Sequence, residues 1–313
     1  MRRRIILAGG SGFLGQTLAS YFKEQGFEIA VLTRASCHAD NAVRQVGWDA
    51  RTLGPWQKEL EGATAVINLA GRSVNCRYHA LNRREILDSR VNSTRILGEA
   101  IKRCVHPPEV WLNASTATLY RHTFGKAWNE AGEIGATPEA KDAFSIEVGQ
   151  AWERTFTEAE TARTRKVAMR LAMVLGMGGN SVFPVLRRLV RLGLGGKMGS
   201  GRQFISWIHE ADFCRAVGWL IGKQDLQGPI NLAAPNPISN SEMMRTLRQV
   251  LGVPIGLPSA EWMLEVGTFF LRTETELLIK SRRVVPAKLL DSGFRFQFAT
   301  IREAFENLCN GRG

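Results

Sequence analysis

A glycine-rich segment near the start of the chain has the spacing of a phosphate-binding turn. Residues 9–15 read GGSGFLG, directly after the apolar run 3–8 and directly before a helical apolar repeat over 14–26. Glycines there can adopt positive φ and let the backbone approach a pyrophosphate, whose charge the free N–H groups and the helix dipole stabilise. We therefore predict a dinucleotide contact made by Gly9, Gly10, Ser11, Gly12, Phe13, Leu14 and Gly15.

The end of the second apolar run indicates which dinucleotide binds. Residues 27–32 lead to Thr33 and Arg34, the place where strand two of a Rossmann unit contacts the adenosine ribose. Asp or Glu there would accept a hydrogen bond from the 2′-hydroxyl of NAD, whereas a guanidinium suits the additional phosphate of NADP. Thr33 and Arg34 thus predict NADP(H) as the cofactor. The alternative is that Arg34 is an ordinary solvated side chain.

The apolar runs that must position these residues alternate with helical stretches. Runs at 63–71, 110–115 and 166–172 have the length of buried strands. This alternation predicts an α/β fold, a doubly wound parallel sheet of the Rossmann type. We assign residues 1–175 to an NADP-binding Rossmann domain and residues 176–313 to a smaller C-terminal substrate-capping lobe, from which 205–235 returns to the core. The first of the three runs ends in small residues that leave room for cofactor, and Leu69, Ala70 and Gly71 at its end are cofactor-binding candidates.

Composition excludes several classes of protein. With 313 residues, 44% of them hydrophobic, the chain can bury a substantial core. No apolar stretch reaches the ~18 to 20 uncharged residues that span a bilayer. The five cysteines are scattered and show no C-x-x-C spacing, so neither a disulfide framework nor a metal site is expected. We predict a metal-free cytoplasmic protein.

The net charge of +12 favours anionic partners without choosing among them. No basic run is long or interleaved with stacking aromatics, so we expect no nucleic-acid partner. Residues 181–192 form an apolar helical stripe with arginines opposite, which favours packing on the protein itself over lying on a membrane. Residues 261–280 are expected to form one or two capping helices, facing the core, the substrate cavity or a dimer contact. The chain is expected to be a monomer or a homodimer.

Several motifs together resemble one family. Beyond the glycine turn, they are NLAG at 68–71, the strand end 115–120, GSGRQ at 199–203, WIHEAD at 207–212, GPINLAAP at 228–235 and PAKLL at 286–290. The chain resembles the atypical extended short-chain dehydrogenases/reductases, in the branch labelled "epimerase family protein" of the NAD-dependent epimerase/dehydratase superfamily. The resemblance covers nearly the whole chain. It implies an NADP-binding Rossmann lobe capped by a C-terminal substrate lobe, in a branch whose physiological substrate is generally unassigned.

The chain departs from the superfamily at the proton-transfer pair. Reductases of the superfamily use Tyr-x-x-x-Lys on a helix, where lysine lowers the pKa of the tyrosine that exchanges a proton with substrate. When the helix is aligned on Glu153, Ser145 and Gly149 occupy these two places. Either another residue transfers the proton, or the protein binds cofactor without turnover.

Two hydroxyl groups are candidate replacements. Ser115 stands at a strand end where the superfamily places a hydroxyl that binds substrate, and Tyr120 stands on the loop expected to cross the cleft. An ordinary phenol, with a pKa of ~10, would need a neighbouring cation, and Arg121 or Lys126 could supply it. A structural role is the alternative for both Ser115 and Tyr120.

Further polar residues could form a mouth for a small, anionic substrate, because arginine donates a planar pair of hydrogen bonds to carboxylate or phosphate. The substrate-binding candidates are Arg77, Arg202, Gln203 and His209, and Arg90 is a candidate for cofactor binding or this anionic mouth. Resemblance favours Arg202 and Arg90, whereas ordinary surface arginines are the alternative. For His209, between a strand and a helix, we favour a structural role.

These observations predict an NADP(H)-binding oxidoreductase or epimerase-like enzyme that transfers hydride to or from a small carbonyl or alcohol. The competing prediction is a catalytically silent NADPH-binding sensor or scaffold, because the Tyr-x-x-x-Lys pair is missing.

Overall fold

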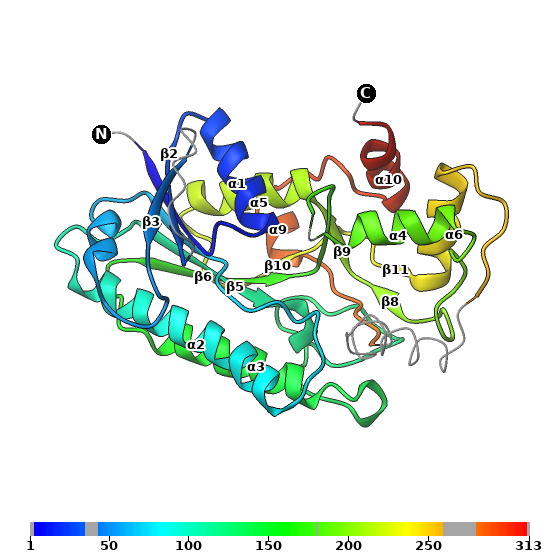
Figure 1. Cartoon of the computed structure of the whole chain (residues 1–313), viewed down its shortest axis with the longest axis horizontal. Helices are drawn as coiled ribbons and strands as arrows, with labels where there is room; N and C mark the ends of the chain where they lie inside the picture. The colour runs from blue at the N-terminus through cyan, green and yellow to red at the C-terminus, as the bar shows by residue number, and fades with distance from the viewer. Residues whose placement is uncertain (1–2, 35–42, 180, 259–279, 312–313) are drawn as a thin grey trace.

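The computed structural model describes residues 3–34, 43–179, 181–258 and 280–311. Its centre is a seven-stranded sheet in the order β10-β6-β5-β4-β1-β2-β3, with every neighbouring pair parallel (Figure 1). This confirms the predicted doubly wound parallel sheet. The strands of the sheet are β1 (Arg4–Ala8), β2 (Glu28–Thr33), β3 (Arg44–Gly47), β4 (Ala65–Asn68), β5 (Val110–Thr116), β6 (Arg165–Leu171) and β10 (Gly228–Leu232).

Helices cover both faces of the sheet because successive side chains of a buried strand point to opposite sides. Along β1, Ile5 and Leu7 pack in the cluster that includes α1 (Phe13–Glu24) and α5 (Glu210–Gly222). Ile6 and Ala8 pack in the opposite cluster, which contains residues of α2 (Ala80–Arg103) and α3 (Ala143–Glu158). Figure 1 shows the two helix pairs on opposite sides of the sheet.

A smaller lobe is built from two parts of the chain, one before β10 and one after it. Its hydrophobic cluster draws residues from α4 (Val182–Arg191), α6 (Asn240–Val250) and α10 (Ile301–Asn310), which gather at the end of the molecule away from β2 and β3 (Figure 1). Two short strand pairs accompany them, parallel β7 (Met173–Leu175) with β9 (Trp207–His209) and antiparallel β8 (Phe204–Ile205) with β11 (Ile238–Ser239). The remaining elements of the described residues are α9 (Ala287–Asp291) and the 3-10 turns Pro55–Leu60, Ala117–Leu119 and Pro138–Ala140.

The chain leaves the sheet at β6 and comes back to it at β10. Strand β10 pairs in parallel with β6 over Gly228–Leu232, and α5 packs against α1. These contacts place part of 205–235 in the core, and the domain boundary itself stays a prediction. The capping helices expected at 261–280 lie, except for Lys280, outside the described residues, as does Cys37. The other four cysteines are free thiols.

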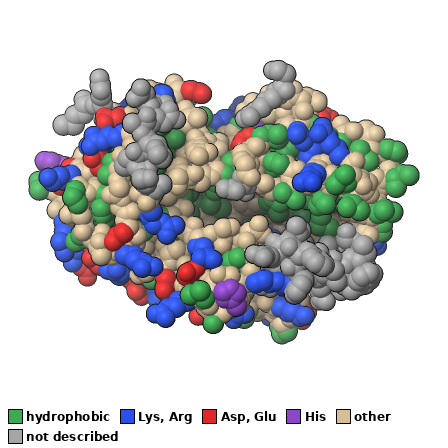
Figure 2. All heavy atoms as spheres, in the orientation of Figure 1, with side chains coloured by type: hydrophobic (Ala, Val, Ile, Leu, Met, Phe, Trp, Pro, Cys, Tyr) green, Lys and Arg blue, Asp and Glu red, His purple; other side chains and the backbone are tan. Residues whose placement is uncertain are grey.

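Side chains of α4 follow its predicted amphipathic pattern only in part. Leu186 and Val190 are buried in the cluster of the smaller lobe, whereas Val185 of the same apolar stripe is exposed. Within the described part of the chain, no helix is long and apolar enough to span a membrane. On the face shown in Figure 2, Lys and Arg side chains occur at several separate places, with Asp and Glu among them.

Close packing inside the glycine turn fixes the start of α1. A Cβ atom on Gly15 would lie 2.6 Å from the carbonyl carbon of Gly10, and a Cβ on Gly9, whose φ is +75°, would lie 2.7 Å from Cα of Ala70. Backbone atoms cannot yield as a flexible side chain can. The turn therefore lies directly on the end of β4.

We predict that Gly15→Ala destabilises the fold by about 1–3 kcal/mol, because the added methyl group overlaps backbone. Gly47→Ala is the matched control, since a Cβ there meets nothing within 4 Å and φ is not in the left-handed region. Chemical denaturation of both variants measures the difference. Equal midpoints for the two variants would contradict the packing.

Candidate functional site

Two cavities flank the glycine turn and share Gly9, Gly12 and Leu69. The first has a volume of about 490 Å³ and lies between the sheet and the smaller lobe, with walls from the turn, the ends of β4, β5 and β6, α2, α3, β7 and the start of α4. The second, of about 350 Å³, lies beside the ends of β2 and β3. Figure 2 shows a hollow floored by hydrophobic side chains near the middle of the face. A two-part ligand bound over the turn could occupy both cavities.

The predicted cofactor residues lie around these cavities. Gly9, Gly12, Phe13, Leu14, Gly15, Leu69 and Arg90 line the first cavity; Gly9, Ser11, Gly12, Thr33, Arg34, Leu69, Ala70 and Gly71 line the second. Gly10 lines neither, because it faces the side chains of Val31 and Leu7 behind the turn. The structure thus brings together residues from four separate segments of the sequence.

Gly12 leaves open the space in front of the helix. A Cβ atom on Gly12 would have only the carbonyl oxygen of Gly9 within 4 Å, at 3.9 Å, and its φ of −80° suits any residue. The first turn of α1 contains no acidic side chain. An open space before the positive end of a helix dipole fits a pyrophosphate.

The second cavity contains more cationic groups than the sequence predicted. Arg34 and Arg51 both line it, and neither forms an ion pair with another described residue. Arg72 also lines it, but its guanidinium is neutralised by Glu85. Arg51 was missed because it follows β3, a strand that the sequence analysis did not identify.

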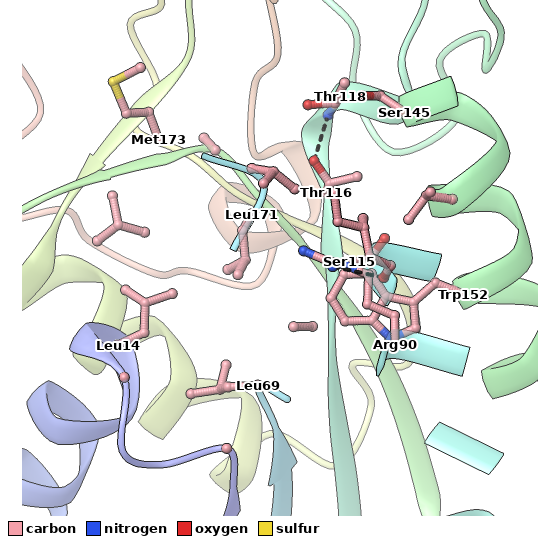
Figure 3. A pocket seen from close by; sticks show the side chains of 18 of the residues that line it. Leu14, Leu69, Arg90, Ser115, Thr116, Thr118, Ser145, Trp152, Leu171 and Met173 are labelled. Atoms are coloured by element: carbon pink, nitrogen blue, oxygen red, sulfur yellow. Dashed lines mark hydrogen bonds between the residues drawn. The ribbon is translucent and has the colours of Figure 1, made fainter. Parts of the chain in front are cut away.

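On the wall opposite the turn, Ser115 forms part of a polar row across three strands. Ser115 of β5 is the register partner of Arg170 of β6, which in turn faces Asn231 of β10. The Ser115 hydroxyl donates to Glu153 Oε1 of α3 at 2.6 Å, and Arg170 donates to both oxygens of Glu153 at 2.8 Å. Figure 3 shows Ser115 on the side of the cavity away from Leu14 and Leu69. Sequence reasoning used Glu153 only to align the helix and missed this contact.

Tyr120 belongs to the same network but lies beneath the cavity. Its side chain is 1% exposed and does not line either cavity, so the loop does not carry it across the cleft as expected. The hydroxyl donates to Asn231 at 2.8 Å and accepts from Arg170 at 2.9 Å. Burial raises the pKa of Tyr120 above its ordinary value, against the opposing charge of Arg170. The expected helper Arg121 instead pairs with Glu133 at the surface.

The charge of Arg170 is firmly held. Desolvation acts to lower the pKa of Arg170, but the hydrogen bonds and charge of Glu153 outweigh it and raise that pKa above its ordinary value. Arg170 therefore stays charged, and it orients both Glu153 and Tyr120.

Ser145 and Gly149, which occupy the places of the missing Tyr-x-x-x-Lys pair, differ in their access to the cavity. Ser145 lines the first cavity near Thr118 (Figure 3), so this place is open to ligand. Gly149 faces Leu119, and a Cβ there would lie 2.7 Å from a Leu119 methyl carbon. Leu119 thus fills the space that a side chain at residue 149 would need.

The four predicted substrate-binding residues do not line either cavity. Arg202 is exposed, with its guanidinium over the ring of Phe124, and buried Gln203 donates to the Met198 carbonyl at 2.9 Å. The Arg77 carbonyl accepts from Asn82. His209 caps α5 by accepting from the Ala211 N–H at 3.0 Å, and burial lowers the pKa of His209 to about 4. A substrate role for these four stays a prediction.

Comparisons with known proteins agree with this arrangement. The model of the NAD dependent epimerase/dehydratase family matches residues 5–233, and a domain of unknown function, DUF1731, matches residues 260–308. Epimerase family protein YfhF of Bacillus subtilis is 29% identical over 98% of both chains. Epimerase family protein SDR39U1 of Bos taurus is 31% identical, covering 97% of this chain and 99% of its own.

A solved structure is similar over nearly the same length. Human epimerase family protein SDR39U1, crystallised with NADPH, superposes with a TM-score of 0.85 at 26% identity and covers 97% of this chain and 98% of its own. The matches confirm the resemblance stated from the sequence motifs.

We predict that Gly12→Val abolishes NADPH binding while leaving the fold intact, because its side chain would occupy open space before α1 and not overlap protein atoms. Cofactor fluorescence titration measures binding, and thermal unfolding without cofactor measures the fold. Retention of wild-type affinity would show that the cofactor does not cross this turn.

Proposed function

This chain belongs to the NAD dependent epimerase/dehydratase family, and from that premise we propose that it is an NADP(H)-dependent oxidoreductase or epimerase-like enzyme. Its substrate would be a small carbonyl compound or alcohol held in the first cavity. The observation that carries the proposal is the Ser115 hydroxyl, which lines this cavity and donates to a carboxylate fixed by Arg170.

The cofactor assignment rests on the fit of the two cavities. The glycine turn would hold the pyrophosphate, with Gly12 supplying the open space, and Arg34 and Arg51 would hold the 2′-phosphate of the adenosine ribose. When bound, NADPH supplies a hydride to a carbonyl carbon, and NADP⁺ accepts one from an alcohol. The NADPH bound to the human relative supports the choice of this dinucleotide.

Ser115 would bind the oxygen of the substrate. Because its own proton is directed at Glu153, the lone pairs of Ser115 Oγ are available to accept from an alcohol. During alcohol oxidation, the substrate proton would pass to Ser115 Oγ as the serine proton passes to Glu153. Carbonyl reduction would use the reverse transfers, so each direction moves one proton and one hydride.

Glu153 is suited to exchange that proton with solvent. Its side chain is 16% exposed and also borders a separate, open groove between α3, β6 and β10. A proton accepted from the cavity side could therefore leave on the groove side. Before the proton arrives, the hydrogen bonds from Arg170 keep the Glu153 carboxylate oriented toward Ser115.

A catalytically silent NADPH-binding sensor is the second candidate. It is favoured by Gly149, whose neighbour Leu119 fills the space of the superfamily lysine. Such a protein would bind cofactor through the same turn but would show no substrate-dependent oxidation of NADPH.

We predict that Arg34→Ala weakens NADPH binding about 10- to 100-fold, the loss expected for one charge-assisted contact. NADH binding should change little because NADH lacks the 2′-phosphate, and Arg34→Ala/Arg51→Ala should remove the preference for NADPH. Arg302→Ala, on α10, is the control for loss of one positive charge. Fluorescence titration with both nucleotides measures these affinities. An equal loss for NADH would assign Arg34 a different role.

We predict that Ser115→Ala lowers substrate-dependent NADPH oxidation by about 10²–10⁴-fold, the usual contribution of proton transfer. Tyr120→Phe should retain most turnover because its hydroxyl faces Asn231 and Arg170 beneath the cavity. A panel of carbonyl compounds followed at the absorbance of NADPH provides the measurement. Tight NADPH binding with no turnover across the panel would favour the sensor, and loss of turnover in Tyr120→Phe alone would restore tyrosine as the acid.

A further inference from the structure

Among the described residues that line the first cavity, Arg90 is the only charged one. The other lining residues that the structure describes are apolar or carry hydroxyl groups, and none of them is a carboxylate. Figure 3 shows Arg90 with Trp152 on the same side of the cavity as Ser115, across from Leu14 and Leu69. A lone cation in such a site determines the sign of the charge that a ligand can bring.

The guanidinium of Arg90 is fixed on three sides. Its Nη1 donates to the carbonyl oxygens of Arg72 and Ile86, both at 3.0 Å, and its Cζ lies 5.1 Å from the centroid of the Trp152 ring. The Trp152 indole N–H donates to Thr94 at 3.0 Å, which fixes that ring in turn. On the third side, the guanidinium packs against the backbone of Gly71, so closely that a Cβ atom on this residue would lie 3.2 Å from Arg90 Cζ.

Part of this guanidinium has no protein partner. Within the described residues, Nη1 makes the hydrogen bonds of the group, and none is made by Nε or Nη2. No Asp or Glu among the described residues lies within ion-pair distance of the Arg90 guanidinium. Burial lowers the pKa of Arg90 to about 10, which leaves it protonated at neutral pH. A half-buried guanidinium that is held in place and keeps free N–H donors facing the cavity can bind an anion through charge-assisted hydrogen bonds.

We propose that Arg90 binds the carboxylate of the substrate, so that the enzyme acts on a hydroxy acid or its oxo acid. This inference rests on the proposed function. The substrate would place its carboxylate at Arg90 and its reacting oxygen at Ser115 on the same wall, with its apolar remainder against side chains such as Leu171 and Val148. The phosphates of the cofactor would lie at the glycine turn, across the first cavity from Arg90, although the guanidinium also packs against Gly71, which lines the second cavity.

Matched acids and amides test the proposal on the protein saturated with NADP⁺. Pyruvate, 2-oxohexanoate and phenylglyoxylate are each titrated by calorimetry beside the corresponding neutral amide. At least one acid should bind 10- to 100-fold more tightly than its amide. Arg90→Met should bind that acid and its amide equally, and Arg90→Lys should retain part of the preference because it keeps the charge without the planar pair of donors.

NADPH titration of the same variants separates the sources of the anion and verifies folding. Affinity for NADPH within about twofold of wild type in both variants is expected if Arg90 serves the substrate. A tenfold loss of NADPH affinity in Arg90→Lys and Arg90→Met, with no change in acid preference, would assign Arg90 to a cofactor phosphate and overturn the proposal. Absence of any acid preference in wild type would also overturn the carboxylate role of Arg90 but would leave the proposed function in place. Failure of wild type to bind NADPH would overturn the proposed function itself.

Discussion

The ion pair between Arg170 and Glu153 is the constraint on which the site depends. Both residues are largely enclosed, with side chains 4% and 16% exposed, and two hydrogen bonds of 2.8 Å join them. Breaking a buried pair typically costs about 3–5 kcal/mol, because the remaining charge has no solvent to stabilise it. Through this pair, β6 fixes α3, and α3 fixes the direction of the Ser115 hydroxyl. The chemistry of one cavity wall therefore depends on a contact that lies behind it.

The opposite wall of the first cavity is the glycine turn. Its position depends on close packing of backbone atoms against other backbone atoms and against the ring of Phe13. The turn lies on the end of β4 through Gly9, and the loop after β7 lies on the turn through Gly176 and Gly178, whose missing side chains would overlap the ring of Phe13. This loop belongs to the chain as it enters the smaller lobe. Phe13 thus joins the cofactor turn to that lobe, and the cavity between them has walls of limited freedom.

Two contacts explain why the chain lacks the proton-transfer pair of the superfamily. Leu119 packs where a side chain at Gly149 would go, so a lysine there would have to displace the Leu119 side chain. Meanwhile Tyr120, a few residues on, is committed to Arg170 and Asn231. The hydroxyl that remains in the cavity with a carboxylate partner is Ser115. Its position in a row with Arg170 and Asn231 follows from the parallel register of β5, β6 and β10.

The sequence by itself determined the sheet, the turn and the family, because these depend on local patterns. Apolar runs define strands, and glycines at 9–15 define a turn that few other residues could form. The sequence could not determine which polar side chains meet. Glu153, Arg170 and Asn231 come from separate elements, and they come together only through strand register and helix packing. For the same reason the tertiary structure alone placed Tyr120 beneath the cavity, added Arg51 to the second cavity and left Arg90 without a carboxylate. Contacts between distant segments are set by the packing of whole elements, and no local pattern encodes them.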